Sequence, residues 1–145
     1  GRDLGTAWRM PGYDDSGWPR GRAQLGFGDG DEATRMAPGS LTYYLRTRFD
    51  VGSGSGPVTL RLLRDDGAAV YLNGVEVVRS NLPAGSLSAA TPASSAVAGA
   101  GESAWYSWTV DPALLRAGEN LLAVEVHNSS RDSSDISFDL ALTRG

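Results

Sequence analysis

The sequence predicts an all-β fold, a two-sheet antiparallel β-sandwich, on three observations. Apolar and polar residues alternate with a period of two in several short segments, and almost no window has helical periodicity. The 145 residues include 19 Gly and 7 Pro, which favour turns between strands. Asn73-Gly74 joins two β-rich runs. A parallel sheet would need crossover helices, for which the chain has no suitable segments.

The segment around Asn73-Gly74 predicts a β-hairpin. A type I′ turn needs positive φ at both central residues, and Asn and Gly adopt it at low cost. In that register the opposed pairs are Leu72 with Val75, Val70 with Val77, and Tyr71 with Glu76. We therefore expect one face of the hairpin to be apolar throughout and the other to face water or a ligand.

The same alternation predicts the other strands, over residues 42–51, 58–62, 104–110, 122–126 and 136–142. Trp105 is expected on the strand face opposite Trp108. Residues 111–115 predict one helical turn, because Asp111 suits an N-cap, Pro fits the first helical position and Gly118 follows as a stop.

Three segments are expected to be irregular. Residues 1–40 predict a wrap without regular structure, whose aromatic side chains plug the edge of the core. Those aromatic residues are Trp8, Tyr13, Trp18 and Phe27. Residues 52–57 predict a connecting loop, since neither flanking strand pattern could form a core alone. Residues 80–103, rich in Ala, Ser, Gly and Pro, predict a long surface excursion and the most mobile stretch of the chain.

Composition limits the classes of protein. The length fits a single domain spanning residues 1–145. All 13 basic residues are Arg, and they are scattered along a chain whose net charge is -4. This distribution predicts no basic surface for binding nucleic acid. The absence of Cys excludes disulfides and thiolate metal sites. No apolar run approaches a membrane span, and the chain starts without Met or a signal peptide, as a segment of a longer protein would.

Catalytic motifs are scarce, and we expect no enzyme. His127 is the only histidine, so any histidine-dependent mechanism must use it. Its expected place at the end of a strand, beside a polar loop, favours a hydrogen-bonding role. Residues 26–30 resemble the start of a glycine-rich dinucleotide-binding motif, but they are followed by Asp31 where that motif needs its third glycine. The sequence also lacks the Gly-x-Ser-x-Gly motif of a nucleophilic serine.

An acidic turn is the best metal candidate. Calcium takes six to eight oxygen ligands, and a Gly-rich turn with alternating acids supplies several from one loop. The predicted ligands are Asp29, Asp31 and Glu32, with Asp135 or Asp139 arriving from elsewhere. The alternative is a solvated acidic turn without an ion.

The candidate ligand-binding residues combine aromatic rings with acids, amides and a cation. Sugars are recognised by aromatic faces, while polar groups satisfy their hydroxyls. The candidates are Asp65, Asp66, Tyr71, Asn73, Trp105, His127, Asn128 and Arg131. Trp105 fits best, because it alternates away from the apolar face. In the alternative, Trp105 and Tyr71 cover core edges, and Asp65 and Asp66 cap a turn.

Several segments together resemble a known family. Residues 44–51, 66–77 and 114–126 resemble the galactose-binding-like jelly roll, and most of all the sugar-binding-type accessory domain of secreted bacterial glycoside hydrolases. Trp8 with residues 13–19 resembles the entry segment of those domains. Residues 127–139 are similar to a variant appended to secreted phosphoesterases.

The resemblance implies a non-catalytic accessory carbohydrate-binding module of a secreted multidomain bacterial enzyme. Its partners would be a polysaccharide or glycan and the neighbouring domains of the parent protein, at a secreted or cell-surface location without a membrane span. It also raises the expectation of a structural calcium. The alternative is an architectural or protein-interaction module that packs against a catalytic domain without binding sugar, because the fold does not determine the function.

Overall fold

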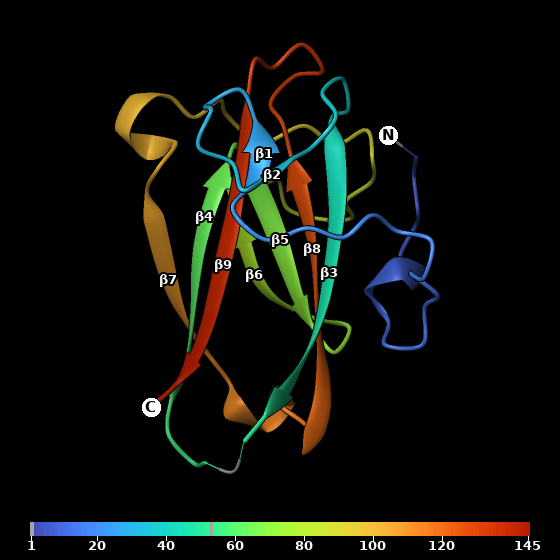
Figure 1. Cartoon of the computed structure of the whole chain (residues 1–145), viewed down its shortest axis with the longest axis vertical. Helices are drawn as coiled ribbons and strands as arrows, with labels where there is room; N and C mark the ends of the chain where they lie inside the picture. Colours follow the sequence, from blue (N-terminus) through green and yellow to red (C-terminus); the bar gives the residue numbers. More distant parts are fainter. Residues whose placement is uncertain (1, 53) are drawn as a thin grey trace.

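The computed structural model describes residues 2–52 and 54–145, so Gly1 of the predicted domain and Ser53 of the predicted loop lie outside the described residues. Two β-sheets pack face to face (Figure 1). The strands are β1 (Leu25–Phe27), β2 (Thr34–Arg35), β3 (Thr42–Val51), β4 (Val58–Asp65), β5 (Gly67–Leu72), β6 (Val75–Ser80), β7 (Trp105–Val110), β8 (Gly118–His127) and β9 (Ile136–Arg144). The short 3₁₀ turns are η1 (Ala7–Arg9), η2 (Gly99–Gly101) and η3 (Pro112–Leu114).

The strand order confirms the all-β sandwich. One sheet has the order β2-β1-β9-β4-β7 and the other β3-β8-β5-β6. Neighbouring strands are antiparallel, except that β1 and β2 run parallel. The expectation that residues 1–40 lack regular structure is wrong for β1 and β2, because β1 pairs with β9 and extends the five-stranded sheet. Among the described residues, the helical turns lack the length and the hydropathy that a membrane-spanning helix requires.

The main core lies between the two sheets. Period-two alternation directs alternate residues of each strand inward, where Leu60, Leu62, Val70 and Val126 are fully buried. Residues of β3, β8 and β9 complete this core as the alternation predicts. The predicted turn is also confirmed as η3, where the Asp111 carboxylate accepts a hydrogen bond from the Ala113 amide.

A second apolar cluster covers the outer face of the four-stranded sheet. Trp8 of η1 is fully buried there against Tyr71 of β5 and Tyr44 of β3, with ring centroids 5.8 and 4.7 Å away. Leu121 and Ala123 of β8 complete this cluster. The part of the N-terminal wrap around η1 therefore forms a lid on the outer face of this sheet. This N-terminal lid shields the outward-pointing residues of β5 and β8 from water.

The hairpin departs from the expected register at one point. Leu72 pairs with Val75 and Tyr71 with Glu76 as expected, but a bulge between Val70 and Tyr71 makes Val70 pair with Val78 and not Val77. The extra residue in β6 shifts the pairing beyond the bulge. The pairs on this face, Leu72 with Val75 and Val70 with Val78, are apolar as expected, although Val75 at the turn is 48% exposed.

The 80–103 excursion is irregular but attached to the sandwich. The amide of Ala93 donates to the carbonyl of Asn128, and Ala93 is itself buried. The amide of Val97 donates to the Asp66 carboxylate, which also accepts from the amide of Ser129. These bonds place the end of the excursion beside β4 and the loop after β8.

The turn residue Asn73 is a buried connector. Its φ of 51° and the φ of 91° at Gly74 confirm the positive values expected of the turn. Its amide donates to the carbonyl of Leu114 and to the side chain of Asn120, while its oxygen accepts from the amide of Leu121. The hairpin tip is thereby tied to η3 and β8.

We predict that Asn73→Ala lowers the free energy of unfolding by about 3 kcal/mol, because it leaves buried polar groups unpaired and places a residue other than Asn or Gly at positive φ. Urea unfolding followed by tryptophan fluorescence measures the change. Val75→Ala, at the exposed neighbour in the same hairpin, is the matched control and should cost less than about 1 kcal/mol. Equal losses in both variants would contradict the connector role.

Candidate functional site

Acidic side chains converge at the end of the five-stranded sheet where β1, β9 and β4 lie side by side. Ser137 of β9 is opposite Gly26 of β1 on one side and Asp65 of β4 on the other. The hydroxyl of Ser137 donates to the carboxylate of Asp29 at 2.5 Å. The sheet register therefore brings Asp65 and the 28–32 turn to the same outer face.

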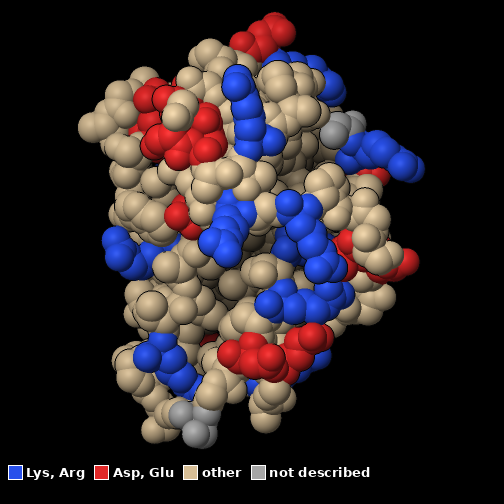
Figure 2. Space-filling view, in the orientation of Figure 1, with Lys and Arg blue, Asp and Glu red and all other residues tan. Residues whose placement is uncertain are grey.

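Three carboxylates from separate segments form the centre of this cluster. One oxygen each of Asp29, Glu102 and Asp135 lies within 4.8 Å of the other two. Gly28 permits the approach, because its φ is +107° and a Cβ there would lie 2.6 Å from the Cβ of Asp135. Figure 2 shows acidic side chains gathered at the upper left, where Figure 1 places β1 and the turn near residue 100. These three residues could hold a metal ion.

Asp65 adds a buried carboxylate beside the three. Asp65 is 3% exposed, and its Oδ1 has no hydrogen-bond partner within residues 2–52 and 54–145. Burial, followed by the neighbouring Asp66, Asp135 and Glu102, raises the pKa of Asp65 to about 8. A buried, unpaired carboxylate oxygen is costly unless a proton or a cation satisfies it. The residues present therefore fit a hard cation.

The structure brings together part of the predicted metal set. Asp29 and Asp135 meet as expected. Asp31 is exposed and outside the cluster, and Glu32 instead accepts a hydrogen bond from the amide of Asp29. Backbone hydrogen bonds, first from its own amide, lower the pKa of Glu32. Glu102 was missed, since it lies in an Ala- and Ser-rich stretch without a motif.

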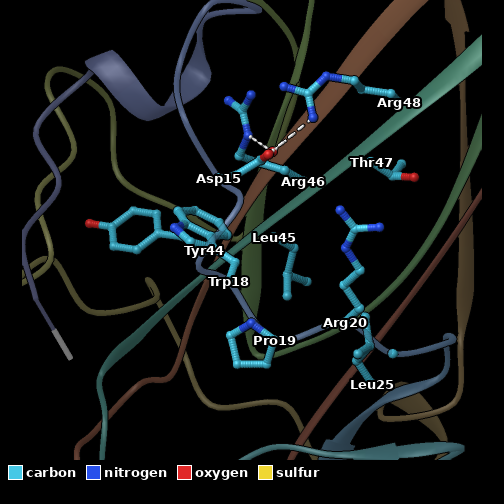
Figure 3. Close-up of a pocket in the computed structure, with 11 residues that line it drawn as sticks. Asp15, Trp18, Pro19, Arg20, Leu25, Tyr44, Leu45, Arg46, Thr47 and Arg48 are labelled. Carbon is cyan, nitrogen blue, oxygen red and sulfur yellow. Dashed lines mark hydrogen bonds and ion pairs between the residues drawn. The ribbon is translucent and has the colours of Figure 1, made fainter.

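A groove lies between the N-terminal wrap and β3. Its volume is about 440 Å³, and its lining comes from residues 15–25 and from the middle of β3. The lining residues are Asp15, Trp18, Pro19, Arg20, Gly21, Leu25, Tyr44, Leu45, Arg46, Thr47 and Arg48. In Figure 3, Trp18 and Tyr44 lie on one side of Leu45 and Arg20 on the other.

Arg46 of β3 holds the wrap in place. Its guanidinium donates to the carboxylate of Asp15 at 2.6 Å and to the carbonyls of Trp8, Met10 and Tyr13. The Arg46 side chain is 1% exposed, so these acceptors surround it. A planar guanidinium with five donors suits a site where several carbonyls converge. The wall of the groove therefore depends on one arginine.

The groove continues into an apolar hollow at the open edge of the sandwich. This hollow of about 210 Å³ shares Gly21, Leu25, Leu45, Arg46 and Thr47 with the groove. Its remaining apolar lining is Ala23, Leu122, Val124, Phe138 and Leu140. Because these side chains come from both sheets, the floor of the groove is the exposed margin of the main core.

Tyr71 and His127, two of the predicted ligand residues, belong to a buried polar network under the N-terminal lid. The Tyr71 hydroxyl and the Arg9 guanidinium donate to one oxygen of Glu125, at 2.6 and 3.0 Å. The His127 Nε2 lies 3.1 Å from the other oxygen, and its Nδ1 lies 2.6 Å from the carbonyl of Thr91. Burial alone would raise the pKa of Glu125, but these hydrogen bonds outweigh it and lower the pKa.

The other predicted ligand residues are dispersed. Asp65, Asp66, Asn73 and Asn128 are buried, and Asp66 and Asn73 hold backbone amides. Trp105 of β7 is 39% exposed on the face opposite Trp108, as expected, with the Arg61 guanidinium 5.2 Å from its ring. Arg131 is exposed in the loop before β9. Ligand contact by these residues stays a prediction. The groove residues Trp18, Tyr44 and Arg20 were missed as a site, because the wrap and β3 are remote in the sequence.

Comparisons with known proteins identify the fold alone. No protein-family profile matches the chain, and no curated protein matches it by sequence. Among solved structures, the chain is similar to a crystal structure of a beta-glycosidase from Bacteroides vulgatus, with a TM-score of 0.50 and 17% identity. The similarity covers 98% of this chain and 19% of the glycosidase, so the chain spans about a fifth of that protein's length.

We predict that acid weakens the contact between the wrap and β3. The hydrogen bond from Arg46, helped by Arg48 and opposed by burial, lowers the pKa of Asp15 below its ordinary 3.8. The stabilisation is therefore complete above that value and is lost as the pH falls through the lower, folded-state pKa. Asp15→Asn should lower the free energy of unfolding by about 2 kcal/mol at about pH 6, and by less at about pH 3, which lies below the ordinary pKa of an aspartate.

Urea unfolding at both pH values measures the difference. Asp132→Asn, at an exposed carboxylate in the loop before β9, is the control and should change stability by less than about 0.5 kcal/mol at both pH values. A loss in Asp15→Asn that is equally large at both pH values would contradict the ionic origin of the contact.

Proposed function

We propose that this chain is a non-catalytic accessory carbohydrate-binding module of the galactose-binding-like jelly-roll type, from a secreted multidomain enzyme. The observation that carries the proposal is the groove between the wrap and β3. It places the aromatic side chains of Trp18 and Tyr44 beside guanidinium groups over an apolar floor. Sugar rings bind through their C–H faces to such surfaces, while their hydroxyls bind to the flanking polar groups.

The state of the only histidine supports a binding role over a catalytic one. His127 is fully buried, and both ring nitrogens are occupied by Glu125 and Thr91. The nearby Glu125 is 1% exposed and bound to three donors. A general acid or base must reach the substrate directly or through one water, and these groups are enclosed by the sheet and its N-terminal lid.

We also propose that calcium binds the acidic cluster. Asp29, Glu102 and Asp135 offer converging carboxylate oxygens. Asp65 has an unpaired Oδ1, and it lies near enough to Asp135 and Glu102 for their charges to raise its pKa. Hard carboxylate oxygens suit calcium, whose coordination tolerates ligands from separate loops and is completed by carbonyl oxygens and waters. A bound ion would join the 28–32 turn, the end of the excursion and the start of β9.

The second candidate function is architectural. The apolar hollow formed by Leu122, Val124, Phe138 and Leu140 at the edge of the sandwich favours it, because a neighbouring domain could insert an apolar side chain there. The parent protein would then hold this chain as a packing module, and no polysaccharide would bind to it.

Affinity electrophoresis of the whole chain through gels containing neutral or acidic polysaccharides tests the proposal. We expect retardation in at least one gel, and we expect Trp18→Ala to abolish it. Trp105→Ala is the matched control, since it removes an exposed tryptophan from β7, outside the groove. Loss of retardation in Trp105→Ala alone would move the site to β7, and no retardation in any gel would favour the architectural function.

Calcium binding is tested by thermal unfolding with calcium or with a chelator. Calcium at 100 times its dissociation constant should stabilise the fold by about 2.7 kcal/mol, because the ion binds the folded state. Asp65→Asn and Asp135→Asn should remove most of the shift. Asp31→Asn is the control and should retain it. An unchanged melting temperature of the unsubstituted chain, or loss of the shift in Asp31→Asn alone, would contradict the assigned site.

A further inference from the structure

The groove concentrates positive charge on an acidic protein. The chain has a net charge of -4, yet three arginines and one aspartate line the groove. These arginines are Arg20, Arg46 and Arg48. Figure 2 shows basic side chains gathered around the hollow near the centre of this face. Such a local excess attracts anions into a concave, partly apolar site, where screening by water is weaker than on a flat surface.

The three arginines are not equally available to a ligand. Arg46 is enclosed and bound to Asp15 and to carbonyls of the wrap. Arg48 also forms an ion pair with Asp15, but its side chain is 37% exposed. Its contact with Glu119 is long, at 3.7 Å. Arg20 is exposed and makes no hydrogen bond or ion pair within the described ranges 2–52 and 54–145. Since Asp15 is already neutralised, Arg20 is available to bind an anion, and Arg48 can add a second guanidinium by giving up its long contacts with the carbonyl of Pro11 and with Glu119.

Their placement suits an anion carried on a ring. In Figure 3 the guanidinium of Arg20 lies across Leu45 from Trp18 and Tyr44, and the guanidinium of Arg48 lies above Leu45, beside Asp15. The floor between the two sides is apolar, formed by Leu25 and Leu45. A guanidinium binds carboxylate or sulfate oxygens through two parallel hydrogen bonds, whereas a neutral sugar hydroxyl offers it a single acceptor atom.

We propose that the groove binds an anionic sugar of an acidic polysaccharide, with its carboxylate or sulfate held by Arg20 and Arg48 and its ring against Trp18 and Leu45. The inference rests on the proposed carbohydrate-binding function and names its substrate class. A simple polyanion would use only the arginines, and a neutral glycan only the aromatic and apolar side. The anionic sugar uses both, which is why the two kinds of side chain share one groove.

Isothermal titration of the whole chain compares polygalacturonate with the same polymer after full methyl esterification, which removes the charge and retains the sugar ring. We expect the charged polymer to bind at least about tenfold more tightly, with an affinity that falls as salt is added. Arg20→Gln should weaken binding of the charged polymer about tenfold and leave binding of the ester unchanged. Arg131→Gln, at an exposed arginine before β9, is the control and should change neither.

The other outcomes separate this inference from the function on which it rests. If both polymers bind equally and Trp18→Ala abolishes binding of both, the groove binds neutral sugar and the anionic preference is wrong. Tighter binding of dextran sulfate than of polygalacturonate would support the inference and identify sulfate as the anion. Polyphosphate binding as tightly as either acidic sugar would overturn it, because the sugar ring would then contribute nothing. Absence of binding to every polymer would overturn both proposals.

Discussion

The structure depends on the closure of two sheets over one apolar core. Leu60, Leu62, Val70 and Val126 are completely buried between the sheets, and burial of such side chains stabilises a fold by about 1.5–3 kcal/mol each. Because the inner faces are filled, polar groups that could serve chemistry are confined to the outer faces, the strand ends and the open edge. Both candidate sites follow this constraint. The acidic cluster lies at the end of β4 and the start of β9, and the groove lies along the edge strand β3.

The N-terminal wrap adds a third layer to the two-sheet sandwich, on the outer face of the four-stranded sheet. Trp8 packs on Tyr44 and Tyr71, and Arg46 binds the backbone of the wrap from below. The apolar and polar contacts have different consequences. Burial of Trp8 covers the sheet face, whereas the directed hydrogen bonds of Arg46 determine where the chain passes over β3. The groove exists because the wrap is held at that position.

The same wrap explains why two of the expected ligand residues, Tyr71 and His127, lie in the interior. Alternation shows that Tyr71 and His127 point away from the main core, and a strand face that points away from the core is often open to water. Here η1 covers this strand face, and Glu125 accepts hydrogen bonds from Tyr71, Arg9 and His127 in a buried network. A buried carboxylate requires such partners, and removal of one leaves the others unpaired. These residues maintain the packing of the lid.

Local sequence alone determined the strands from β3 to β9, the Asn73-Gly74 turn and the capped turn at Asp111, because period-two alternation, positive φ and side-chain capping involve neighbouring residues. Alternation also placed Trp105 opposite Trp108. Tertiary structure decided the bulge at Val70, the covering of Tyr71, and the meeting of Glu102 with Asp29 and Asp135. It also decided that Trp18 and Arg20 face the middle of β3. Each of these depends on strand order, register and the path of a long loop, which bring together residues that no local pattern relates.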